Sequence, residues 1–364
     1  MRYHEDIVTA DNFYEMIKRA DEGDTMAQYF TAFYILNQME RSDYDKDIID
    51  RAFSYLRAAA MSSYFRGVAA IDLGGFFHSG QYVEQDFKKA VMWYRTAAQS
   101  QNPIGYYCLG QCFYRGHGVE LNHAKAYDNF FKGTMKGFNI NSVVASDMFK
   151  NGEFVEKDMQ FAATLYKRVY EEELGFFAIN DFYSDTYGQV CLRLGECYLH
   201  GIGVAPDTEK ANFYFKEAKV QHTDNEYIDT TSTAEVPDLV ELMEGAPYDE
   251  CAKNEAQAIY ISDDEYISLI AQKFNELKLD CDAENNPKKI EDFNSQESLE
   301  AYKLISKALL INDKKLSVNP YMTLAILYPR LVCVEQDQGF IDYCNKTSEK
   351  WNVDMTIEDC EASG

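Results

Sequence analysis

The residues that come closest to a metal site lie between positions 280 and 291. Asp280, Asp282, Glu284 and Glu291 supply oxygen atoms at positions 1, 3, 5 and 12 of a loop, which is the ligand spacing of a helix–loop–helix calcium site. That site also needs a glycine at position 6 and a short backbone pairing near position 8, where this sequence has asparagine and Pro287. We therefore interpret the segment as a polar connection between two helices and predict no metal ligand, with calcium binding kept as the alternative.

Other groups that could do chemistry also have a structural interpretation. His78, His117 and His200 lie where successive helices are expected to end, but they keep no common spacing from a carboxylate or thiol, as a zinc site would require. Ser262 followed by the acids 263–265 is typical of a helix start, with an N-cap serine and acids in the first turn. No phosphate-binding glycine loop, nucleophile elbow or Ser-x-x-Lys motif occurs. We predict no catalytic residue and no cofactor.

The elements that position these groups are set by a repeated segment. The pattern Leu-Gly-x-x-aromatic-x-x-Gly, followed by Lys-Ala, ends at Gly80, Gly116 and Gly201, and a degraded copy ends at Gly152. These glycines stand 36, 36 and 49 residues apart. A period of this length indicates helical hairpins that bury their apolar faces only against their neighbours. The alanine that follows the lysine recurs in every copy, and it allows close approach of two helices: Ala52, Ala90, Ala126, Ala162 and Ala211.

The repeat predicts five helical hairpins, preceded by an unpaired second helix at about 9–22. An insertion of about 13 residues around Glu171–Tyr187 explains the longer last interval, and we expect it to form a loop between two hairpins.

Residues 194–204, Leu-Gly-Glu-Cys-Tyr-Leu-His-Gly-Ile-Gly-Val, with Asp207, Lys210 and Ala211 after them, resemble the signature of the Sel1-like repeat family, a relative of the tetratricopeptide repeats. The resemblance covers roughly residues 9–220. It implies an all-α fold, a right-handed α-solenoid whose first helices line a concave face. It also implies a protein-binding adaptor, since few members of the family are enzymes.

The predicted domains are a repeat solenoid at 1–220, an acidic loop at 221–248, a divergent helical capping region at 249–350 and a frayed tail at 351–364. Residues 221–250 contain nine acids and no Lys or Arg, which is typical of a loop. In the C-terminal region the pattern predicts helices at about 249–260, 263–277, 296–311, 319–335 and 337–350.

The repeat also indicates which side chains of the first helices face a partner. We define the first-helix face as the residues directly before and after the Leu-Gly pair, or the pair at its position, in each copy: Asp72 and Gly75, Cys108 and Gln111, Val144 and Asp147, Arg193 and Glu196. We predict the partner-binding groove at five of them: Asp72, Gln111, Asp147, Arg193 and Glu196. A solvated helix face would show the same polar variety, so that interpretation stays open.

The formal net charge of −25 argues against binding to nucleic acid or to an anionic membrane and favours a basic protein or peptide partner. The beginning of the chain lacks the basic flank and apolar run of a signal peptide, and the nine cysteines are scattered, so we expect a cytoplasmic protein. The leading hypothesis is a non-enzymatic scaffold. The alternatives are a toxin-neutralising immunity or inhibitor protein and, with less support, a penicillin-binding hydrolase of the Sel1-like type.

Overall fold

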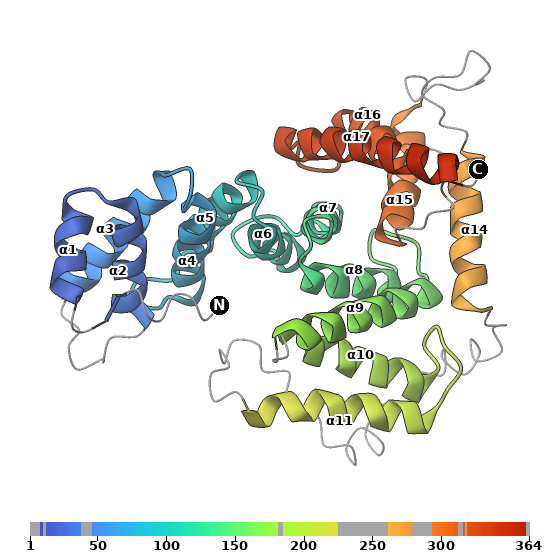
Figure 1. The fold of residues 1–364 in the computed structure, drawn as a ribbon, viewed down its shortest axis with the longest axis horizontal. Helices are drawn as coiled ribbons and strands as arrows, with labels where there is room; N and C mark the ends of the chain where they lie inside the picture. The colour runs from blue at the N-terminus through green and yellow to red at the C-terminus, as the bar shows by residue number, and fades with distance from the viewer. Residues whose placement is uncertain are drawn as a thin grey trace. The chain divides into compact units, whose positions relative to one another are not determined.

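The structure is a computed structural model that describes residues 8–9, 12–37, 46–180, 185–224, 261–277, 293–311, 316 and 319–361. All regular elements in these ranges are helical (Figure 1). The contacts divide the chain into two units, 1–137 with 337–340, and 138–336 with 341–364. The predicted helix at 249–260, the 280–291 loop and most of the acidic segment lie outside the described residues.

The first unit contains one unpaired helix and three hairpins, as the repeat predicts. Its helices are α1 (Phe13–Asp21), α2 (Thr25–Asn37), α3 (Lys46–Met61), α4 (Arg66–Ser79), α5 (Phe87–Gln99), α6 (Pro103–Arg115) and α7 (His123–Met135). Helix α1 packs on α2, and the hairpins are α2–α3, α4–α5 and α6–α7.

The second unit continues the repeat and adds the C-terminal helices. Its elements are α8 (Asn139–Asn151), α9 (Met159–Asn180), α10 (Asp185–His200), α11 (Thr208–Asp224), α14 (Asp263–Glu276), α15 (Ser295–Ile311), α16 (Pro320–Leu327), a 3₁₀ turn (Tyr328–Arg330) and α17 (Gln338–Glu361), whose first residues belong to the first unit. The insertion expected to form a loop is mostly helical instead, because it lengthens the end of α9 and the start of α10.

The hairpin turns share one construction, which explains the glycine and the acid of the repeat. The four terminal glycines have φ between 70° and 76°, a left-handed conformation that ends the first helix and that glycine adopts without strain. The second helix then begins at Asp86, Asn122, Asp158 or Asp207, whose side chain accepts a main-chain hydrogen bond of 2.9–3.0 Å from three residues later. This N-cap satisfies a donor that the helix itself leaves unpaired.

The glycine of the Leu-Gly pair makes room for an aromatic ring. A Cβ added to Gly110 would lie 2.6 Å from the ring of Phe130 in α7, and Gly74 and Gly195 face the rings of Tyr94 and Phe215 in the same way. The five alanines that recur in the second helices are 0% exposed. In these three hairpins, close approach therefore depends on the glycine of one helix as well as on the alanine of the other.

The C-terminal region contains a further hairpin of this construction. One helix was expected over 319–335, but α16 ends at Leu327 and a turn follows, so this expectation was wrong. After the turn, Asp337 accepts a hydrogen bond of 3.1 Å from the main-chain N–H of Phe340, as the N-cap acids of the repeat do. The Val-x-x-Asp spacing of the repeat turns recurs here without the glycines. Helix α17 then continues to Glu361, beyond the residue at which a tail was expected.

Residues 337–340 pack within the first unit, against α6 and α7. The Tyr106 hydroxyl donates a hydrogen bond of 2.6 Å to Asp337. Lys132 is 1% exposed and forms an ion pair of 2.8 Å with the buried Asp128, while its Nζ lies 4.0 Å from Asp337. A buried charge is tolerated when it is paired and hydrogen-bonded, so these residues form one connected polar cluster.

Candidate functional site

The structure divides the five predicted groove residues into three kinds. Asp72 on α4 and Gln111 on α6 lie in the first unit, whereas Asp147 on α8 and both Arg193 and Glu196 on α10 lie in the second. Successive first helices contact each other, α4 with α6 and α8 with α10. Whether a side chain remains available to a partner differs among them.

Asp147 and Arg193 are committed to each other. The Nε and Nη2 atoms of Arg193 donate hydrogen bonds of 2.9 and 2.7 Å to the Asp147 carboxylate, and the Tyr166 hydroxyl donates to the same group. Burial opposes the charge of Arg193, but these hydrogen bonds raise its pKa above the usual value. A bidentate pair of this kind fixes geometry. The two residues therefore clamp α8 to α10 and are mainly structural.

Glu196 lies beside this clamp and is much more exposed. Its side chain is 43% exposed, and the Lys150 ammonium lies 3.6 Å from its carboxylate. Exposed ion pairs at such distances contribute little stability. Glu196 can therefore exchange Lys150 for a cation of a partner at small cost.

Asp72 and Gln111 hold buried acceptors without donors. The Oδ2 atom of Asp72 and the Oε1 atom of Gln111 are enclosed and accept no hydrogen bond from the described residues. Burial raises the pKa of Asp72 to about 7, although a hydrogen bond with Tyr29 opposes the shift. An unsatisfied buried acceptor costs about 1–3 kcal/mol. Both residues are part-exposed as a whole, although these two oxygen atoms are buried.

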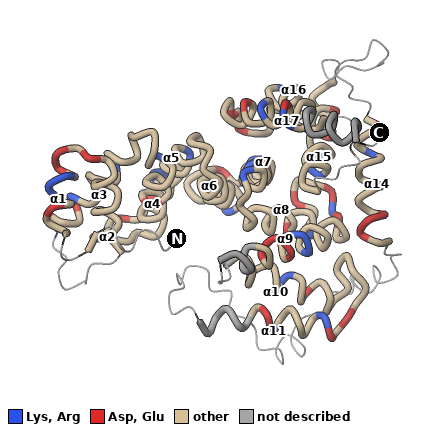
Figure 2. The backbone as a smooth tube through the Cα atoms, in the orientation of Figure 1, with Lys and Arg blue, Asp and Glu red and all other residues tan. Residues whose placement is uncertain are grey.

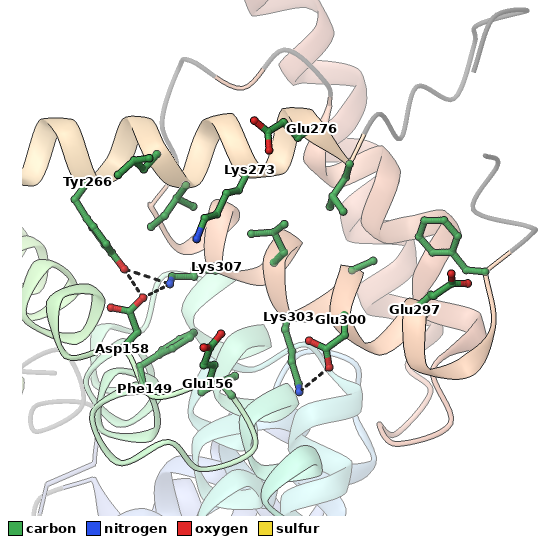
Figure 3. Close-up of a pocket in the computed structure, with 17 residues that line it drawn as sticks. Phe149, Glu156, Asp158, Tyr266, Lys273, Glu276, Glu297, Glu300, Lys303 and Lys307 are labelled. Carbon is green, nitrogen blue, oxygen red and sulfur yellow. Dashed lines mark hydrogen bonds and ion pairs between the residues drawn. The ribbon is translucent and has the colours of Figure 1, made fainter. Parts of the chain in front are cut away.

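A cavity of about 680 Å³ lies in the second unit, away from these positions in the sequence (Figure 3). It is bounded by α14, α15 and the turn between α8 and α9. Apolar side chains contribute much of its wall: Phe149, Val155, Leu269, Ile270, Leu277, Phe293, Ala301 and Leu304. Leu269 is 41% exposed. We call this feature the α14–α15 groove.

One end of the α14–α15 groove is closed by a polar triad. The Tyr266 hydroxyl and the Lys307 ammonium both donate hydrogen bonds to Oδ2 of Asp158 (Figure 3). Burial lowers the pKa of Lys307, and the Asp158 charge partly offsets this shift. Burial opposes ionisation of Asp158, but Lys307 and Tyr266 hold its pKa below the usual value. The three groups satisfy one another and act as an anchor between the repeat and the C-terminal helices.

The residues of this groove were not predicted as a site. Asp158 was visible only as part of the repeat turn, and the partners of α14 and α15 depend on contacts between residues more than a hundred positions apart. The available signal was the helical spacing of Tyr266, Ile270 and Lys273 along one face of α14.

Two further interpretations can be compared with the structure. The Ser262 hydroxyl accepts a hydrogen bond of 3.3 Å from the N–H of Glu265, which confirms the N-cap. His78 and His117, which share no spacing in the sequence, lie with Nε2 and Nδ1 3.2 Å apart. In the described ranges no three His, Cys, Asp or Glu side chains gather as a metal site would require.

Among the helices described, none has the length and apolar character to cross a membrane.

The comparisons with known proteins agree with the repeat. A Sel1 repeat model matches residues 25–64, 67–102, 103–138, 144–172 and 189–219, which correspond to the five hairpins from α2–α3 to α10–α11. No curated protein matches the chain.

Two solved structures are similar to this chain. One is a Sel1 repeat protein from Oxalobacter formigenes, with 20% identity and a TM-score of 0.45 over 58% of this chain and 85% of that one. The other is c5321, described as a protective antigen present in uropathogenic Escherichia coli strains and displaying an SLR fold, with 18% identity and a TM-score of 0.42 over 93% of this chain and 79% of that one. With five matched repeats and the hairpin construction that they encode, the chain belongs to the Sel1 repeat family.

Proposed function

We propose that this protein is a non-catalytic scaffold that binds a protein or peptide through its first-helix face. Sel1 repeat proteins are in general scaffolds for protein interaction. The positions assigned to a partner are Asp72 and Gln111 in the first unit and, as a separate part of the face, Glu196 in the second. Asp147 and Arg193 support the face by joining α8 to α10.

The observation that carries the proposal is the pair of buried acceptors on α4 and α6. An acceptor that lacks a donor in the free protein gains a full hydrogen bond when a partner supplies one. The oxygens of Asp72 and Gln111 are in this state, and they occupy equivalent sides of successive first helices. A partner with amide or ammonium donors removes this cost when it binds, so binding is favoured over solvation of the empty face.

The charge of the chain favours a basic partner. With 60 acidic and 35 basic residues, the protein attracts cations over long range and accelerates their association. Ionised Asp72 pairs with a cation, whereas protonated Asp72 does not. Because the pKa of Asp72 is about 7, binding of a basic partner strengthens as the pH rises from 6 to 8.

Short random peptides displayed on phage and selected on the full chain supply the probe. Fluorescence anisotropy then measures the affinity of the selected peptides for wild type, Asp72→Asn and Gln111→Leu. We expect selected peptides rich in Lys and Arg, and affinities at least about tenfold weaker for each variant, as for loss of one hydrogen bond to a charged or buried group.

The matched control is Glu120→Gln, which removes one negative charge from an exposed turn position outside the first-helix face. It should leave the affinity within about twofold of wild type. Equal affinity for wild type, Asp72→Asn and Gln111→Leu would refute binding at the first-helix face.

A further inference from the structure

The α14–α15 groove has the shape of a helix-binding site. Its walls are faces of α14 and α15 that run in opposite directions. Tyr266 at the start of α14 contacts Lys307 near the end of α15, and the end of α14 lines the cavity together with the start of α15. From Tyr266 to Leu277 the α14 wall extends about 16 Å at ~1.5 Å per residue.

The lining positions on both helices recur at spacings of three and four, which is one complete helix face. On α14 they are Tyr266, Leu269, Ile270, Lys273, Glu276 and Leu277, and on α15 they are Glu297, Glu300, Ala301, Lys303, Leu304 and Lys307. Two helix faces that normally pack on each other here enclose a cavity of about 680 Å³. A third helix, packed by its side-chain ridges into the space between them, matches this geometry.

The charges along the groove indicate the chemistry of that helix. Acids outnumber lysines in the lining, and two lysines are already neutralised, Lys307 by Asp158 and Lys303 by Glu300. Lys273 makes no ion pair with any described residue, and in Figure 3 it extends toward Lys307 at the closed end.

The opposite end, where α14 finishes and α15 begins, is acidic. Glu276 accepts a hydrogen bond of 2.8 Å from Gln272 but has no cationic partner in the described ranges. Glu297 lies at the same end (Figure 3). Figure 2 shows both signs of charge on α14. This end attracts cationic side chains, whereas the triad at the other end carries no net attraction for them, so the charges fix the orientation of a bound helix.

We propose that the α14–α15 groove binds an amphipathic helix of a partner protein, with apolar residues spaced i, i+4, i+7 and with Lys or Arg at the end that meets Glu276. This surface is separate from the first-helix face, so it does not depend on the function proposed above. A scaffold with both surfaces holds two partners on one chain.

The probes are two fluorescein-labelled synthetic peptides, each of four helical turns with leucines at i, i+4, i+7 and i+11. One carries lysines and the other glutamates at the flanking positions. Anisotropy titrations on the full chain should give saturable binding of the lysine peptide and affinity at least about tenfold weaker for the glutamate peptide. Leu269→Asp and Glu276→Lys should each weaken the lysine peptide about tenfold or more, as expected for central interface residues.

Controls separate the groove from general attraction to an acidic protein. Leu121 is 54% exposed and does not line the groove, so Leu121→Asp, which adds the same charge as Leu269→Asp, should leave the affinity unchanged. Circular dichroism verifies that each variant retains the wild-type helical content.

Three results would overturn the proposal. The first is absence of saturable binding by either peptide. The second is equal affinity of the lysine peptide for wild type and Leu269→Asp, which would indicate attraction by charge alone. The third is a dimer in light scattering that Leu269→Asp dissociates, which would show that a second copy of this chain occupies the groove.

Discussion

Replacing Asp72 by Asn should make the protein more stable at pH 8 and less stable at pH 4. Burial raises the pKa of Asp72 from 3.8 to about 7, so the folded protein binds the proton more tightly than the unfolded chain. The stabilisation by the protonated carboxyl is complete below pH 3.8 and is lost as the pH rises through 7. At 1.36 kcal/mol per pKa unit, the whole change is about 4 kcal/mol.

The amide introduced by Asp72→Asn does not ionise, so its contribution is the same at every pH. Its Oδ1 can accept the hydrogen bond from Tyr29, but its Nδ2 then replaces an oxygen that has no partner among the described residues and costs about 1–3 kcal/mol. The variant is therefore about 1–3 kcal/mol less stable than wild type at pH 4 and about 1–3 kcal/mol more stable at pH 8. The two stability curves cross between these values.

Urea unfolding followed by circular dichroism at several pH values between 4 and 8 measures this difference. Subtracting wild type from variant removes the titration of the other acids. If the free-energy difference for Asp72→Asn varies by less than about 1 kcal/mol over this range, Asp72 titrates as an ordinary solvated carboxyl and the reasoning is refuted.

Three further predictions concern the repeat construction. Gly118→Ala should lower the melting temperature strongly, because Gly118 has a φ of +71° and the new Cβ would lie 2.3 Å from a main-chain oxygen. Gly75→Ala, with open space around its Cβ, should instead raise stability by up to about 1 kcal/mol. Similar melting temperatures for the two variants would contradict this. Arg193→Lys should lower the free energy of unfolding measured in urea by about 1–3 kcal/mol, because one ammonium cannot reproduce the bidentate hydrogen bonds to Asp147. An unchanged urea midpoint would show that this ion pair does not stabilise the fold. Burial and a neighbouring histidine lower the pKa of His78 below 6.5. The contribution of neutral His78 to folding stability is therefore present above pH 6.5 and is lost as the pH falls. His78→Gln should reduce the loss of stability that wild type shows between pH 6.5 and 5, and parallel stability curves for the two proteins would contradict this.

The repeat allowed the hairpins to be predicted because its residues act locally. Gly80 ends a helix and Asp86 begins the next through hydrogen bonds within a few positions, so the spacing in the sequence is sufficient. The α16–α17 hairpin lacks those glycines, and only Val334 and Asp337 remain of its turn. Once the glycines are gone, a long apolar segment is indistinguishable from a single helix.

The sequence indicated which positions lie on the first-helix face, but not which of their side chains are already paired or buried in the folded protein. The repeat placed Asp147 and Arg193 on the first-helix face, but their distance of 46 residues in the sequence conceals the ion pair that occupies both. In the same way, nothing near Asp72 in the sequence indicates that its Oδ2 lacks a donor among the described residues. Such states depend on which side chains of the neighbouring hairpin reach the same space, and the α14–α15 groove depends wholly on such long-range packing.

The docking of residues 337–340 into the first unit has a consequence for synthesis of the chain. Tyr106 leaves the ribosome 231 residues before Asp337, which is roughly 10–50 s at ~5–20 residues per second. Throughout that interval the Lys132–Asp128 pair has formed in a hairpin that lacks its acidic partner and the ring of Phe340. The third hairpin, although it lies in the middle of the array, therefore completes its polar cluster only after residues 337–340 have been synthesised.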